Sequence, residues 1–427
     1  MKKLLSLVVV LFLAASQTSW GAESKAGGLE LSGNIDVVTG FQYDDSNALG
    51  TAIGGQLGEF RGATAPSKKT FNFYIDQFEL DINKSFGENI RLRADLDFGR
   101  QLSGSTRNTN SAGYAGTVFP TSGGGFTGAG TSNFEIEQAY ITFNGFGAEF
   151  LLGRFNAPIG YYVVDRNDNP SISFSTIFKY LTPTNVTGGK VYYSFNNLID
   201  WHVYLMNNIS DSTAFGFGPN ASGSTPNPGG ISGSGTAFQG YGPIPSWGTR
   251  IGFNWGDEDK KSTIGISYVG GPNRFGCGAG GLAYCNSNLT NMVDLDLAIK
   301  FTPKFLLAAE GIYRQDNTDI VGGANDKAFG AFFLTNYDFN EKWRAYLRFG
   351  FLQDKTGFYT GGALATVGGV TTLNGENIYD IALGAGYQIT DGAKMKVEYS
   401  PSIFNPRVAG LSTSLSHGFA LEFAYNF

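Results

Sequence analysis

Charged side chains stand at alternate positions in the stretch IRLRADLDF, residues 90–98. Arg91, Arg93, Asp95 and Asp97 are each flanked by apolar residues. Alternation at period two predicts a β-strand with one charged face and one apolar face. Guanidinium and carboxylate groups on a common face can attract ions and hydrogen-bond polar solutes, or they can pair across neighbouring strands. Their chemistry therefore depends on what that face contacts.

Two further stretches repeat this arrangement with basic residues. Arg344 and Arg348 alternate with apolar residues in 343–351, and Lys394 and Lys396 do so near residue 395. If the polar faces line a wet interior, these side chains face a lumen and the apolar faces contact lipid. Charges of both signs are mixed along the strands, so anion and cation preference both stay open.

Asp165, Asn167 and Asn169 have the D-x-N-x-N spacing that opens a calcium-binding loop. Pro170 stands where the turn glycine of such a loop is required, and Thr176 stands in the place of the bidentate glutamate. We therefore interpret the three residues as turn-forming side chains and predict neither a metal site nor another cofactor.

His202 and His417 are the only histidines, and we expect both to alternate inward. A hydrolase would need a base beside an activated nucleophile, and no nucleophile motif accompanies either residue. The sequence therefore favours a protein that is not an enzyme, with a barrel hydrolase as the alternative.

Cys277 and Cys285 are the only cysteines and lie within one Gly-rich segment. In an exported protein, which meets an oxidising environment, a disulfide that closes this loop is the expected outcome.

Composition separates this chain from ordinary soluble proteins. Its 427 residues include 61 Gly, 36 Phe and 21 Tyr, and only 15% are charged. Soluble domains carry about 25% charged residues. The formal net charge of -6 argues against a nucleic-acid partner.

The N-terminus has the pattern of a secretory signal peptide. Lys2 and Lys3 precede an apolar run over 4–15, and small residues follow, including Gly21 and Ala22. The sequence predicts a cleaved signal over 1–21 and a mature chain over 22–427. An uncleaved anchor is the alternative, but the run is short for a span of about 20 residues.

Two-faced segments recur along the chain, and we predict about sixteen strands of membrane-spanning length. They begin near Leu29, Phe71, Glu88, Asn133, Ala148, Gly188, Leu198, Gly248, Thr263, Asn291, Lys304, Ala328, Trp343, Ile378, Ala393 and Leu415. Short turns and long Gly/Ser/Asn-rich loops follow them in strict alternation. This asymmetry is typical of an all-β transmembrane antiparallel barrel with short periplasmic turns and long extracellular loops.

The last residues, HGFALEFAYNF, place Phe423, Tyr425 and the terminal Phe427 at alternate positions. This ending resembles the C-terminal signature of bacterial outer-membrane barrels. The resemblance implies that the barrel assembly machinery reads the final aromatic residues, and that the protein resides in the outer membrane of a diderm bacterium.

The loop after the fifth strand contains G-R-F-N-A-P-I-G followed by D-x-x-x-N-P-S-x-S. This motif resembles the β-barrel porin-2 (OmpL-like) family and, more loosely, the general and phosphate-selective sixteen-stranded porins. In general porins the third loop folds inward and narrows the pore. The resemblance therefore implies a constriction loop over 157–187, a homotrimer, and four constriction residues: Asp165, Arg166, Asp168 and Lys179. No loop carries a dense run of Lys or Arg, which argues against phosphate selectivity.

These observations together predict an outer-membrane channel for passive diffusion of small hydrophilic solutes or ions, since about sixteen strands enclose a water-filled lumen. The candidate lumen residues are Arg91, Arg93, Asp95, Asp97, Arg344, Arg348, Lys394 and Lys396. The other alternative is a closed barrel whose long loops act as an adhesin or receptor.

Overall fold

The computed structural model describes residues 28–44, 69–98, 134–206, 245–257, 261–272, 289–317, 325–356, 363–367, 370–407 and 413–427. The predicted signal peptide over 1–21 lies outside the described residues, as do Cys277 and Cys285 of the predicted disulfide.

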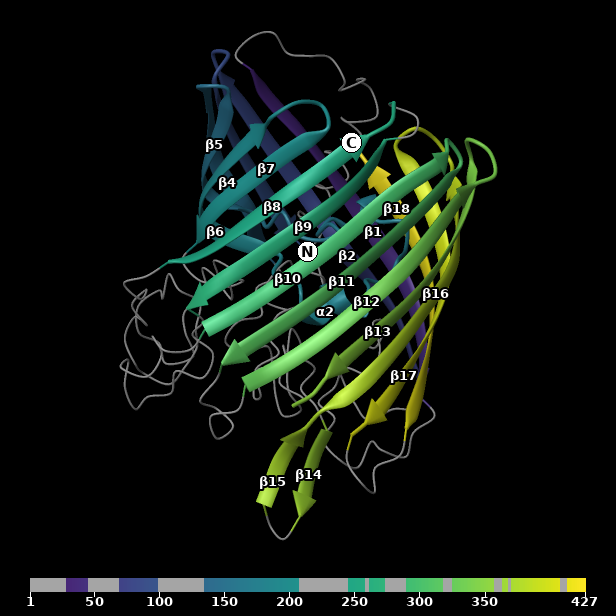
Figure 1. Ribbon diagram of the computed structural model, residues 1–427. Helices are drawn as coiled ribbons and strands as arrows, with labels where there is room; N and C mark the ends of the chain where they lie inside the picture. The colour runs from purple at the N-terminus through teal and green to yellow at the C-terminus, as the bar shows by residue number, and fades with distance from the viewer. Residues whose placement is uncertain are drawn as a thin grey trace, which may run out of the picture.

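Sixteen strands close into one antiparallel barrel (Figure 1). They are β1 (Leu29–Asp44), β2 (Lys69–Phe86), β3 (Ile90–Phe98), β4 (Phe134–Gly145), β5 (Ala148–Asn156), β6 (Asn185–Ser194), β7 (Ile199–Met206), β8 (Ser246–Trp255), β9 (Ser262–Pro272), β10 (Leu289–Thr302), β11 (Phe305–Asn317), β12 (Asn325–Asp338), β13 (Trp343–Asp354), β16 (Glu376–Gln388), β17 (Ala393–Pro406) and β18 (Ser414–Asn426). Successive strands pair with each other, and β18 pairs with β1 to close the ring. The predicted barrel is confirmed, and its strands begin within three residues of the predicted starts.

Two short strands are additional to the prediction. β14 (Ala363–Val367) and β15 (Val370–Asn374) form a separate hairpin between β13 and β16 (Figure 1). Each has only five residues, too few for a two-faced pattern to stand out in a loop. The described residues also contain the helix α2 (Thr176–Tyr180) and the 3-10 turn η2 (Arg166–Asp168). None of the described helices is long and apolar enough to cross a membrane.

The two faces of each strand differ in exposure as the alternation predicts. On β18, Phe419, Leu421 and Phe423 are 47%, 42% and 49% exposed, whereas Ala420 and Glu422 between them are buried. The same apolar face continues around the barrel, which is the surface that a lipid bilayer covers. The interior face carries the polar residues and is covered in part by the chain itself.

Short turns join the strands at one end of the barrel. They comprise residues 87–89, 146–147, 195–198, 303–304, 339–342 and 389–392, and residues 258–260 of the connection between β8 and β9 lie outside the described residues. In the turn between β4 and β5, Phe146 and Gly147 both have positive φ, 56° and 78°, as a two-residue hairpin turn of type I′ requires. In the turn over 195–198, the Asn196 side chain accepts hydrogen bonds from the backbone N–H groups of Leu198 and Ile199. The predicted segregation of short turns from long loops is confirmed.

The expected inward orientation of His417 is wrong. It shares the outward face of β18 with Phe419, and its ring stacks on Tyr43 and Tyr399. Its Nδ1 lies 2.8 Å from the Tyr399 hydroxyl. Alternate positions along a strand share a face, so a lipid-facing Phe419 also places position 417 outside. His202 does point inward, with Nε2 3.4 Å from Asp200.

The orientation of the barrel predicts how it responds to charge on its outer face. Leu295 lies near the middle of β10 and is 49% exposed. Leu295→Arg should lower the free energy of unfolding by about 2–4 kcal/mol, because it places a cation near the bilayer midplane. Reversible denaturant unfolding in lipid vesicles measures this change.

Phe301→Arg is the matched control, because Phe301 has the same outward orientation at the end of the same strand. Near the interface the cost should fall to about 0–1 kcal/mol. Equal costs for the two variants would contradict the assigned membrane depth.

Candidate functional site

The segment between β5 and β6 runs inside the barrel. We call residues 157–184 the inward loop. Its helix α2 lies against β12, β13 and β16, and Figure 1 shows α2 within the ring of strands. The other long connections lie largely outside the described residues, whereas the inward loop is described throughout.

Apolar packing holds one side of the inward loop. Phe174 and Phe178 stack with ring centroids 4.9 Å apart, and Tyr162 meets Phe332 of β12 edge-on at 5.2 Å. Other loop residues in the same buried cluster are Ile159, Val164, Ile177, Tyr180 and Leu181. Burying one such side chain fully contributes about 1.5–3 kcal/mol. The loop lies inside because its apolar side chains find partners there.

The wall beneath these side chains is apolar as well. It comprises inward residues of β7, β9 to β13, β16 and β17: Tyr204, Met206, Val269, Met292, Ala308, Ile312, Ala328, Phe332, Leu334, Leu352, Ile378 and Phe404. The polar lining that the alternation predicts for the inward faces therefore does not extend to this sector. Segments such as AFFLT in β12 are apolar on both faces, and this sequence feature could have predicted an apolar inner wall.

Wall carboxylates bind the beginning of the inward loop through its backbone. The N–H of Gly160 donates to Asp294 Oδ1 at 3.1 Å, and the N–H of Tyr161 donates to Glu310 Oε2 at 2.8 Å. Gly160 has φ of 78°, and a Cβ there would lie 2.6 Å from Glu310 Oε1. This close approach to the wall therefore requires glycine.

Basic residues hold the middle of the loop. Arg166 pairs with Asp76 of β2 and is 1% exposed, with its guanidinium 4.3 Å above the Phe174 ring. Lys394 donates to the carbonyl of Asn167, and Lys396 donates to the carbonyl of Asn169 at 3.0 Å. Lys396 also pairs with Glu422 at 2.8 Å.

Polar contacts with β13, β16 and β17 follow. Glu398 Oε2 accepts the N–H of Ile172 at 2.8 Å. Arg348 Nε lies 3.0 Å from Asp380 Oδ1, and its Nη1 donates to the Tyr162 hydroxyl at 2.8 Å and the Ser173 carbonyl at 2.5 Å. Arg348 is only 1% exposed, because the loop covers it.

The structure separates the four candidate constriction residues. Arg166 is buried in an ion pair, and Asp165 is half-buried beside Gln77 of β2. Asp168 is exposed, and Lys179 is half-buried at the edge of a gap. Burial raises the pKa of Asp165, while hydrogen bonds with Glu79 and Gln77 oppose that shift.

The eight candidate lumen residues all lie on the inward faces of their strands, but their surroundings differ. Asp95 and Asp97 are fully buried, and Asp95 accepts a hydrogen bond from Arg93 Nε at 2.8 Å. Arg344 is 41% exposed near Asp338 of β12. Arg91 lies exposed near the periplasmic turn. Arg348, Lys394 and Lys396 hold the inward loop instead of facing open solvent.

The D-x-N-x-N segment forms a turn with its own backbone. The Asn169 side chain accepts from the N–H of Val163 at 3.1 Å and donates to the carbonyls of Val163 and Asp165. Asn167 donates to the side chain of Asn426. These contacts agree with the interpretation of turn-forming side chains.

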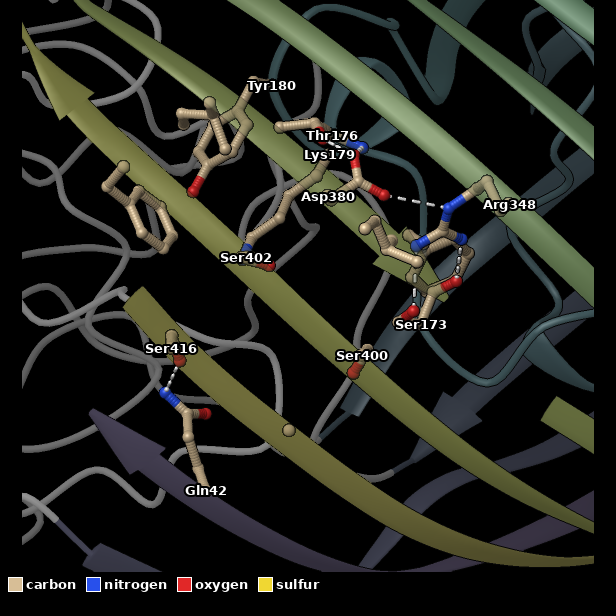
Figure 2. A pocket seen from close by; sticks show the side chains of 15 residues that line it. Gln42, Ser173, Thr176, Lys179, Tyr180, Arg348, Asp380, Ser400, Ser402 and Ser416 are labelled. Atoms are coloured by element: carbon tan, nitrogen blue, oxygen red, sulfur yellow. Dashed lines mark hydrogen bonds and ion pairs between the residues drawn. The ribbon is translucent and has the colours of Figure 1, made fainter. Parts of the chain in front are cut away.

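A narrow gap separates the inward loop from the polar sector of the wall (Figure 2). Its volume is about 40 Å³. The loop contributes Ser173, Phe174, Thr176, Lys179 and Tyr180, and the wall contributes Gln42, Arg348, Ile378, Asp380, Ile381, Ser400, Ser402, Phe404, Ser416 and Gly418. In Figure 2 the Lys179 side chain extends toward Ser402 of β17. The sequence analysis missed the wall serines, because an uncharged hydroxyl carries no conspicuous signal.

Solved structures with the same architecture are outer-membrane channels. The channel DcaP of Acinetobacter baumannii has 12% identity and a TM-score of 0.57, covering 95% of this chain and 99% of that one. An anion-selective porin from Comamonas acidovorans has 9% identity and a TM-score of 0.54, covering 94% and 100%. Pseudomonas putida OprB has 13% identity and a TM-score of 0.54, covering 94% of each chain. At such identities the likeness shows the fold alone.

The family follows from the sequence comparison. No curated protein matches this chain, but the family model described as "Putative beta-barrel porin-2, OmpL-like" matches residues 28–417. This match covers the whole barrel up to the last strand. The chain belongs to this porin family and is an outer-membrane channel for passive diffusion.

Proposed function

We propose that the inward loop is the constriction of this channel and that solutes pass between it and the polar sector of the wall. The observation that carries the proposal is the small gap whose wall side carries Ser400, Ser402, Ser416 and Gln42 beside the apolar Ile378, Ile381 and Phe404. Hydroxyl and amide groups replace part of a solute's hydration, so a narrow gap with such groups along its wall favours small hydrophilic solutes.

Fixed contacts support the role of the inward loop in setting the width. Its backbone hydrogen-bonds to Asp294 of β10, Glu310 of β11, Arg348 of β13, and Lys396 and Glu398 of β17. A loop held at so many points keeps one position, because moving it would expose several buried charges at once. The proposal covers residues 157–184 of the predicted segment 157–187, because residues 185–187 belong to the wall strand β6.

We also propose that Lys179 biases the gap toward anions. Among the described residues that line it, the charged ones are Lys179, Arg348 and Asp380. The Lys179 ammonium lies 5.3 Å from the centroid of the Tyr180 ring, and its side chain extends along the gap toward Ser402. Within a narrow opening one fixed charge raises the local concentration of counter-ions.

The environments of the two histidines support the inference that the protein is not an enzyme. His202 lies beside Asp200 and against the Tyr192 ring, with centroids 4.7 Å apart. His417 packs among aromatic rings on the outer face. In the part of the chain that the structure describes, neither arrangement brings a histidine to an inward hydroxyl nucleophile, and we infer that the barrel is a channel and not a hydrolase.

Processing and assembly complete the proposal. Cleavage of the predicted signal should leave a mature chain that begins near Ala22, and the resemblance to general porins implies a homotrimer. Mass spectrometry of the protein purified from outer membranes tests both points. Under denaturing conditions the intact mass shows whether the signal has been cleaved, and under native conditions it gives the number of subunits. A chain that retains residue 1, or a native monomer, would contradict the respective part.

Single-channel conductance tests the proposed constriction. The wild-type protein in planar bilayers should give discrete current steps, and Ser402→Trp should reduce the step by roughly half or more, because an indole fills the gap. Ser402→Ala is the control and should keep the wild-type step. An unchanged step in the Trp variant would place the narrowest point elsewhere. A wild-type protein with no steps would favour the adhesin or receptor alternative.

Ion selectivity tests the role of Lys179. Lys179→Glu should lower the anion-to-cation permeability ratio about twofold or more, since the fixed charge at the opening changes sign. Lys179→Arg keeps the charge and should keep the ratio. Reversal potentials in a salt gradient measure both. Identical ratios for the Glu variant and the wild type would contradict the proposal.

A further inference from the structure

Three carboxyl groups from three elements meet where the inward loop crosses β2 and β4. They belong to Glu79 of β2, Glu137 of β4 and Asp165 of the loop, and one oxygen of each lies within 4.8 Å of the others. Glu79 is 2% exposed and Glu137 is completely buried. The sequence gives no hint of this cluster, because its members are up to 86 residues apart (165 − 79).

Apart from the contact between the carboxyl groups of Asp165 and Glu79, the groups that donate hydrogen bonds to these two side chains are neutral amides. Glu79 Oε2 accepts from Asn34 Nδ2 at 2.7 Å and from Gln77 Nε2 at 3.3 Å. The same Gln77 nitrogen lies 3.2 Å from Asp165 Oδ1.

Glu137 has the least compensated carboxylate of the three. Its Oε1 accepts from Asn156 Nδ2 at 2.8 Å. Its Oε2 is fully buried and accepts no hydrogen bond from an amide, a hydroxyl or a cation of the described residues, while the Glu137 side chain meets the carboxyl group of Asp97. A buried, unpartnered carboxylate oxygen loses its hydration without replacement, which is costly unless a proton or a cation is present.

Nearby charges increase the need for a counter-charge. Asp97 of β3 lies directly opposite Glu79 in the sheet, and its Oδ1 is 3.3 Å from Gln77 Nε2. The loop cation Arg166 is engaged with Asp76, and Arg154 Nε of β5 donates to the backbone carbonyls of Ile136 and Glu137. Like charges that share a buried site cannot all ionise unless a positive charge joins them.

We propose that Glu79, Glu137 and Asp165 bind a divalent cation of the calcium class. Calcium binds carboxylate and amide oxygens at about 2.3–2.6 Å, so oxygens within twice that distance of one another can share one ion. Magnesium keeps several waters in a strict octahedron, which suits a buried group of carboxylates less well. The cation joins the inward loop to two wall strands.

This site is separate from the D-x-N-x-N pattern, although Asp165 belongs to both. The pattern takes its oxygens from one continuous turn, whereas the cluster takes them from β2, β4 and the loop. The inference also holds whether or not the loop sets the conductance, since it concerns only how the loop is fastened.

Calcium titration of the full-length protein tests this inference. The protein is folded in detergent without lipopolysaccharide, treated with EDTA and dialysed, and then titrated with calcium chloride in a calorimeter. We expect a single binding site whose affinity falls about tenfold or more in Glu137→Gln and in Asp165→Asn, since each removes one charged ligand. Asp165→Asn lies in the loop, so the test does not depend on a strand variant folding.

Asp294→Asn is the matched control, because it also removes a buried wall carboxylate that contacts the inward loop. It should bind calcium as the wild type does. Calcium should also raise the unfolding temperature of the wild type and of Asp294→Asn, but not that of Glu137→Gln.

Three outcomes would overturn the proposal. The first is a wild-type protein with no calcium binding at millimolar concentrations, which would mean that the carboxyl groups share protons instead. The second is an equal loss of affinity in Asp294→Asn. The third is magnesium binding as tight as calcium binding.

Discussion

No backbone polar group in the core of a bilayer can hydrogen-bond to water, and this constraint determines the barrel. Each unsatisfied N–H or C=O costs several kcal/mol in hydrocarbon. The pairing of β1 with β18 removes the two sheet edges that would carry such groups. Closure then leaves every side chain two directions, toward lipid or toward the interior. Leu421 and Glu422 are consecutive residues that take the two directions.

Closure also creates an interior that the strands cannot fill by themselves, and the inward loop occupies it. Apart from η2 and α2 the inward loop has no regular structure, so it needs partners for many of its own N–H and C=O groups. Inward charges supply them: Lys396 binds the carbonyl of Asn169, and Glu398 binds the N–H of Ile172. The apolar sector around Phe332 supplies the remaining contacts. From the sequence these charged residues look like the lining of an open pore. In the structure their first role is to form hydrogen bonds with the backbone N–H and C=O groups of a buried loop.

The strands could be predicted from the sequence because lipid and interior impose a local, period-two pattern. The position of the inward loop could be expected from its apolar residues, which a surface loop would leave exposed. Its partners could not, because Ile172 and Glu398 are 226 positions apart and meet only through the register of the closed sheet. The serines of the gap could not be predicted either, since hydroxyl side chains are equally common in turns and on barrel walls. His417 could have been placed correctly from Phe419 alone.

The satisfied interior charges limit what composition can say about selectivity. Arg348 is neutralised by Asp380 and Lys396 by Glu422, so neither contributes a net charge to a passing ion. A sum of the formal charges of all inward residues on the strands would therefore count both cations as if they were available to a passing ion. The field that a solute meets depends instead on the few charges that remain at the opening after the loop has used the others. In a barrel of this kind, the contacts of the inward loop therefore determine which charges are available to the solute.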